Sequence, residues 1–201
     1  IRVMKLSWGR NFENWMRKRK TRRSQKSLPP AIQTLEERTL LTVSTLFANN
    51  ELTVVVDEGN DSVALGTSTA NPTQLELTVN GVVDTSLPPI AANTVGSVVI
   101  IGSDGANSID LSAVNPTDFS FTDPVTGDPL QILVDAGNGD DTLIASSGFN
   151  DTLMGGHGDD VISPGALPVA TVTLTFDGGD GADTLTGGPA ADILIGGDGD
   201  D

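Results

Sequence analysis

The segment GGDGADTLTGGPAADILIGGDGDD, residues 178–201, repeats itself every nine residues. Each unit opens with two glycines and carries an aspartate in its sixth place, at Asp183, Asp192 and Asp201. A unit of nine residues is too short to bury an apolar face by itself, so such units become stable only when neighbouring units stack on one another. The segment therefore predicts a stacked repeat architecture.

The same pattern continues toward the N-terminus in less regular units. Residues 155–163 (GGHGDDVIS) keep the whole pattern, residues 136–144 (AGNGDDTLI) begin with alanine, and residues 146–154 (SSGFNDTLM) keep only its second half. Residues 102–110 have asparagine in the aspartate place, and residues 56–64 preserve the pattern faintly. Because several units share one register, the spacing indicates a structural repeat. For the two earliest units we expect β-structure without a bound metal.

Each place in the unit has a chemical role. Tandem glycines permit positive φ angles, so the turn can direct several carbonyl oxygens inward. Calcium prefers six to eight oxygen ligands at roughly 2.3–2.6 Å, which carbonyls and carboxylates supply, and the sixth-place aspartate provides the charged ligand. The last three residues are extended, and the middle one is expected to turn inward as the core residue: Leu143, Leu153, Ile162, Leu185 and Leu194.

The repeat resembles the RTX, or haemolysin-type, calcium-binding nonapeptide repeat. This resemblance implies a parallel β-roll, a β-solenoid in which the first six residues of a unit form a turn and the last three a strand. It places calcium between unit n and unit n+2, so Asp141 would pair with Asp160 and Asp183 with Asp201. Asp192 would share a site with a following unit. The residues 164–177 interrupt the stack, although their segment TVTLTF alternates like a strand and is expected beside the roll.

The resemblance also implies that glycine carbonyls complete the calcium shells. The expected metal-binding glycines are those of the turns: Gly137, Gly139, Gly155, Gly156, Gly158, Gly178, Gly179, Gly181, Gly196, Gly197 and Gly199. The alternative interpretation is a metal-free spacer in which the Asp and Asn residues only form turns.

Charge divides the chain near residue 40. Residues 1–38 hold all eleven Lys and Arg residues with three acids, whereas residues 39–201 hold the remaining 24 acids and no base. An acidic body without bases either expands by self-repulsion or recruits cations, and its many Val, Leu and Ile residues favour recruitment. We expect three parts: a basic leader (1–44), a β-rich region with degenerate repeats (45–133) and a calcium-binding β-roll (134–201). In the second part, LELTVNGVVD (75–84) predicts a hairpin around its Asn-Gly pair.

The basic leader contains the run RKRKTRRSQK at residues 17–26. The alternatives for this run are nucleic-acid binding, a membrane-surface patch, a targeting element and a disordered or helical leader. Nucleic-acid binding is disfavoured because the acidic body would repel the backbone phosphates. No stretch has the length of a membrane span. The segment 32–44 resembles the export region of planctomycete-type extracellular proteins, through its matching residues Leu35, Glu36, Arg38, Leu40 and Leu41. The resemblance implies an exported protein.

Catalytic signatures are scarce. His157 is the single histidine and cysteine is absent, which excludes a histidine triad, an H-E-x-x-H zinc site and a thiol nucleophile in this segment. His157 occupies the variable third place of its unit and is predicted to face solvent. We therefore expect no enzyme activity from these residues.

The expected function is calcium binding by an extracellular or cell-surface module with a structural or adhesive role. Its expected partners are calcium ions, with secretion machinery and surface or matrix components as further candidates. Because the sequence stops inside a repeat, the alternative is the N-terminal part of a large secreted enzyme or toxin. Either Ile1 or Met4 could be the true start.

Overall fold

The computed structural model describes residues 43–56, 59–166 and 172–201 of the chain. All of them belong to one unit, Leu41–Asp201. The predicted leader, including the export segment, lies outside the described residues except for residues 43 and 44. Within the described residues, no helix is long and apolar enough to cross a membrane.

The described residues form β-strands joined by turns and loops, with one 3₁₀ turn at Ala92–Thr94. The strands are β1 (Val43–Ala48), β2 (Glu51–Val56), β3 (Ser62–Thr67), β4 (Leu75–Val79), β5 (Val82–Val83), β6 (Ser97–Asp104), β7 (Ser108–Asp110), β8 (Gln131–Asn138), β9 (Thr142–Ile144), β10 (Asp151–His157), β11 (Val161–Ser163), β12 (Thr175–Asp180), β13 (Thr184–Leu185) and β14 (Ile193–Asp198). The predicted all-β class is confirmed.

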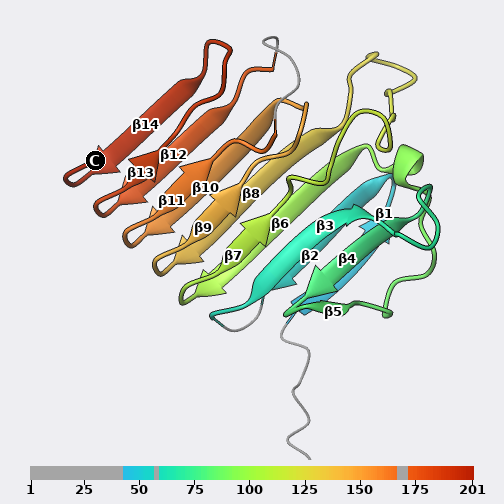
Figure 1. The fold of residues 1–201 in the computed structure, drawn as a ribbon, viewed down its shortest axis with the longest axis horizontal. Coiled ribbons are helices and arrows are strands. Elements are labelled where there is room, and N and C mark those ends of the chain that lie inside the picture. Colours follow the sequence, from blue (N-terminus) through green and yellow to red (C-terminus); the bar gives the residue numbers. More distant parts are fainter. Residues whose placement is uncertain (1–42, 57–58, 167–171) are drawn as a thin grey trace, which may run out of the picture. The chain divides into compact units, whose positions relative to one another are not determined.

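The strands form two seven-stranded sheets (Figure 1). The first sheet has the order β1-β2-β6-β8-β10-β12-β14, and the second has the order β13-β11-β9-β7-β3-β4-β5. From β6 onward the chain alternates between the sheets, and neighbours within each sheet run parallel. The β1–β2, β3–β4 and β4–β5 pairs are antiparallel, so both sheets are mixed.

The antiparallel β4–β5 pair is the hairpin predicted from the Asn-Gly signal. Asn80 and Gly81 connect its strands with φ angles of 51° and 75°. Two consecutive positive φ angles are the requirement of the tight hairpin turn that this dipeptide favours. The sequence prediction is confirmed here.

The hydrophobic core follows the predicted aliphatic places. Leu143 and Ile162 are fully buried and lie opposite one another on β9 and β11. Leu153 pairs with Phe176, and Phe176 with Leu194, across β10, β12 and β14. Leu194 is 44% exposed because β14 is the edge strand of its sheet. The inward-facing rows therefore stack as the repeat predicts, but the prediction of a buried Leu194 was wrong.

The Gly-Gly pairs differ from their expected place. They were expected in turns, but Gly155–Gly156 belong to β10 and Gly178–Gly179 to β12. The parallel strand pairing continues through them because their backbones pair directly, with Gly156 opposite Gly179. The turn proper is therefore limited to the fourth, fifth and sixth places of these units. The strand predicted over residues 171–176 overlaps the observed strand β12 only at Thr175 and Phe176, because β12 starts later and continues through the glycines to Asp180.

Candidate metal centre

The sixth-place side chains of alternate units stack along one edge of the two sheets. In the sequence, each residue of this row, called the ladder below, follows a strand of the first sheet, and all but Asp201 precede a strand of the second: Asp61, Asn107, Asp141, Asp160, Asp183 and Asp201. In each step, a side-chain oxygen accepts a hydrogen bond from the backbone N–H of the preceding ladder residue. From Asp141 onward the N···Oδ1 distances are 2.7, 2.8 and 3.0 Å.

The ladder leaves one carboxylate oxygen of three aspartates without a partner. Asp141, Asp160 and Asp183 are only 1, 1 and 4% exposed, and the Oδ2 atom of each is buried without a hydrogen bond. A buried carboxylate oxygen that lacks a hydrogen bond is costly, and such groups are normally paired or bound to a metal. Three of them in register on one edge indicate a place for cations.

The first-place glycines form a cradle beside these oxygens. A Cβ on Gly155 would overlap Oδ2 of Asp160 and would lie 2.8 Å from the carbonyl oxygen of Gly178. A Cβ on Gly178 would likewise overlap Oδ2 of Asp183 and lie 2.7 Å from the carbonyl oxygen of Gly196. Each cradle thus brings together a carboxylate oxygen of one turn and a carbonyl oxygen of the next, which is the kind of donor set that calcium prefers.

The second- and fourth-place glycines let successive turns approach closely. Gly158 and Gly181 have φ angles of 124° and 150°, and a Cβ on either would overlap the carbonyl oxygen of the corresponding glycine one turn earlier. The predicted metal-binding glycines lie either in the last residues of the first-sheet strands or in the turns that follow them: Gly137, Gly139, Gly155, Gly156, Gly158, Gly178, Gly179, Gly181, Gly196, Gly197 and Gly199. Their roles as ligands remain predictions.

The electrostatics of the ladder favour a cation. Burial raises the pKa of Asp141 to about 7; the Asn107 N–H bond opposes this rise, and the negative charge of Asp160 adds to it. Burial also raises the pKa of Asp160 to about 6, with a contribution from the charge of Asp183. Neighbouring carboxylates therefore repel one another in a partly desolvated row. Among the described residues, no three acidic, histidine or cysteine side chains gather as a metal cluster, so backbone carbonyls must complete any shell.

The structure places Asp192 on the opposite edge, together with Asp151. Asp192 accepts hydrogen bonds from the N–H groups of Leu174 and Gly188, at 2.9 and 2.6 Å. Thr152 pairs with Thr175, and Thr175 pairs with Ile193. The residues that precede these three are Asp151, Leu174 and Asp192, so Leu174 lies between the two aspartates in this second row. The second edge therefore satisfies its carboxylates within the protein and separates them by an apolar residue.

Asp151 supplies a pH-dependent prediction for this second edge. Burial raises its pKa to about 6 from 3.8, against the lowering effect of hydrogen bonds from the N–H and hydroxyl of Ser146. The folded state holds this proton more tightly than the unfolded chain, so the stabilisation is present at low pH and is lost as the pH rises through 6. Through this group alone, the free energy of unfolding should fall by about 2 kcal/mol between about pH 4 and pH 7.

Urea titrations in calcium-free buffer at several pH values, on the parent and on Asp151→Asn, measure this effect. The amide can still accept the Ser146 N–H but does not titrate. The difference between the two proteins isolates Asp151 from the other buried acids. Parallel stability curves for parent and variant would contradict the assignment.

His157 lies in an outer row formed by the third-place residues. Its Nδ1 is 2.8 Å from Oδ2 of Asp180 one turn later, and the two side chains are 68 and 61% exposed. One turn earlier, Asn138 donates to Asp104 at 2.5 Å. The predicted solvent-facing position of His157 is observed, but its pairing with Asp180 was not foreseen. An exposed pair of this kind contributes little to stability.

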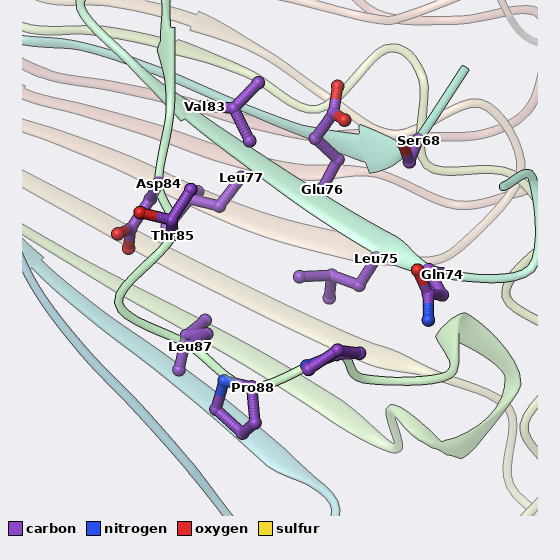
Figure 2. Close-up of a pocket in the computed structure, with 11 residues that line it drawn as sticks. Ser68, Gln74, Leu75, Glu76, Leu77, Val83, Asp84, Thr85, Leu87 and Pro88 are labelled. Carbon is purple, nitrogen blue, oxygen red and sulfur yellow. The ribbon is translucent and has the colours of Figure 1, made fainter. Parts of the chain in front are cut away.

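A shallow pocket of about 320 Å³ lies beside the β4–β5 hairpin (Figure 2). Leu75, Leu87 and Pro88 form apolar parts of its lining, and Glu76 and Asp84 contribute carboxylates. Asp84 accepts hydrogen bonds from the Ser86 N–H, the Ser86 hydroxyl and the Thr45 hydroxyl, which fastens β1 to the segment after β5. The lining residues include no histidine or cysteine, so the pocket offers no pair of nucleophile and imidazole base.

Comparison with known families identifies the repeats. Residues 135–166 and 175–201 match the RTX calcium-binding nonapeptide repeat, in four copies. The resemblance drawn from the sequence is thus confirmed for this part of the chain, and calcium is the ion that such repeats bind. No curated protein and no solved structure matches the chain. The family match does not extend to the export segment, which stays a prediction.

Proposed function

We propose that residues 134–201 form a calcium-stabilised β-roll, and that the ladder edge holds the ions. The buried, unpartnered Oδ2 atoms of Asp141, Asp160 and Asp183 are the observation that carries this proposal. The parallel strands that alternate between two sheets support the roll, because each turn of the chain adds one strand to each sheet.

The proposed ligands come from neighbouring turns. Asp141 with Asp160, and Asp183 with Asp201, supply carboxylates in pairs, and the same geometry also joins Asp160 to Asp183. The turn glycines contribute carbonyl oxygens. Bound calcium would supply positive charge to a row of carboxylates that otherwise repel one another. The folded chain would hold the carboxylate and carbonyl oxygens in register.

Calcium would therefore act as a folding ligand. The unfolded chain has no preformed site, so binding adds its free energy to the stability of the folded state. Extracellular calcium modules work at about 10⁻⁴–10⁻³ M, and a cysteine-free secreted chain needs a staple other than disulfides. These considerations support an exported module with a structural or adhesive role at the cell surface or in a matrix.

Circular dichroism during a calcium titration tests the proposal on the full chain. We expect β-structure to increase as calcium reaches about millimolar concentration, with a much smaller response to magnesium, because magnesium demands six ligands in a rigid octahedron. A spectrum that is fully developed in chelator and indifferent to calcium would reject the proposal.

A further inference from the structure

The turn at residues 102–107 occupies the ladder one step before Asp141. Asn107 stands in the aspartate place and is only 3% exposed. Its backbone N–H donates to Oδ1 of Asp141 at 2.6 Å, and its own Oδ1 accepts from the N–H of Asp61 at 3.2 Å. The turn therefore belongs to the same ladder as the proposed calcium turns, with the same hydrogen bonds on both sides.

These hydrogen bonds fix the orientation of the Asn107 amide. The atom that meets the Asp61 N–H must be an acceptor, so it is the oxygen, and Nδ2 takes the place that Oδ2 takes in Asp141 and Asp160. That Nδ2 atom is buried without a hydrogen-bond partner. At this one turn a pair of N–H donors occupies the place of a free carboxylate oxygen.

The other parts of the cradle are present in this turn. Gly102 holds the first place, and a Cβ there would overlap the carbonyl oxygen of Ala136 in the next turn. Gly155 is placed in the same way, near the carbonyl oxygen of Gly178. Both turns therefore share a first-place glycine beside a carbonyl oxygen of the following turn, and they differ at residue 107 and in the second place, where Ser103 replaces glycine.

We propose that the turn at residues 102–107 is a latent calcium site, and that Asn107 closes the calcium array at this end. An amide nitrogen has no free lone pair for a hard cation, and its N–H dipoles repel one. This proposal rests on the calcium ladder proposed above. It assigns residue 107 as the position that decides whether one further ion binds.

Counting the ions on the full chain tests the assignment. Native mass spectrometry at saturating calcium is expected to show one more ion on Asn107→Asp than on the parent protein. Asn93→Asp is the matched control, because it adds the same charge at an exposed residue of the 3₁₀ turn, outside the ladder. The control is expected to keep the parent's ion count. An unchanged count on Asn107→Asp, or an equal gain on the control, would overturn the proposal.

The reverse exchange keeps the test decisive if Asn107→Asp does not fold. Asp160→Asn preserves an oxygen for the Asp141 N–H but places an amide nitrogen in the cradle of Gly155. It is expected to lose at least one ion, and retention of the parent's count would also overturn the assignment. Failure of the calcium ladder itself would look different, since the parent protein would then bind no calcium.

Discussion

Removal of calcium with a chelator is expected to expose the backbone amides of residues 135–201 to hydrogen exchange while those of residues 59–130 stay protected. Most of the buried apolar side chains precede residue 135, including Leu52, Leu65 and Phe119. The buried aspartates with an unpartnered oxygen all follow it. The first region therefore contributes most of the shared apolar core, whereas on the proposed function the second depends on cations to neutralise its ladder.

Hydrogen exchange measured by mass spectrometry on the full chain, with and without calcium, reports each region separately. At a calcium concentration 100 times the dissociation constant, linkage stabilises the bound form by about 2.7 kcal/mol, which slows exchange through opening about a hundredfold. We expect a change of this order in β10–β13 and little change in β3 and β4. Loss of protection throughout the chain, or no change anywhere, would contradict this division.

Replacing Asp160 and Asp183 together with alanine is expected to raise the calcium concentration at the folding midpoint by at least about tenfold, the scale on which even outer partners of metal sites alter affinity. Both substitutions remove a proposed charged ligand. Each also removes the Oδ1 acceptor of the preceding backbone N–H, Asp141 for residue 160 and Asp160 for residue 183. The midpoint is read from circular dichroism during a calcium titration.

His157→Ala is the control on the same edge. Its side chain is exposed and contacts Asp180 in the outer row, so its loss should leave the midpoint within about twofold of the parent, as expected for an exposed ion pair. If the double aspartate variant folded at the parent's calcium concentration, or if His157→Ala shifted the midpoint equally, the ladder would not be the metal site.

The sequence was sufficient to predict the all-β class and the inward rows, because both follow from the nine-residue period. Leu143 and Ile162 occupy the eighth place of their units and are buried as that place predicts. The Asn-Gly hairpin could also be predicted, since its turn conformation depends on two adjacent residues. Features that depend on adjacent residues or on a short repeat can be predicted from a single sequence.

Pairing across the interrupting segment was harder to predict. Asp160 and Asp183 are 23 residues apart, so the repeat spacing alone does not make them neighbours, yet the Asp160 N–H donates to Asp183. The reason is that β12 pairs with β10 in the register of the repeat, with Gly156 opposite Gly179, although the segment between β11 and β12 is longer than the connections from β9 to β10 and from β13 to β14.

The neighbours of the carboxylates on the second edge could not be predicted without the fold either. Asp192 fits the repeat as well as Asp183 does, but only the strand pairing shows that Leu174 separates it from Asp151. The position of the Asn107 nitrogen likewise depends on the backbone N–H of Asp61, which lies 46 residues earlier in the chain. Contacts at that range have no signal in a nine-residue motif.

The direction of the ladder has a consequence for the timing of folding. From Asp141 onward, each backbone N–H is bonded to a side chain that lies 19, 23 or 18 residues later in the chain. When the polypeptide emerges with its N-terminus first, each turn therefore appears before the later ladder residue whose side chain accepts its backbone hydrogen bond. Each turn must wait for the next to arrive, so order spreads along the chain in the direction of emergence, one turn behind its growing front.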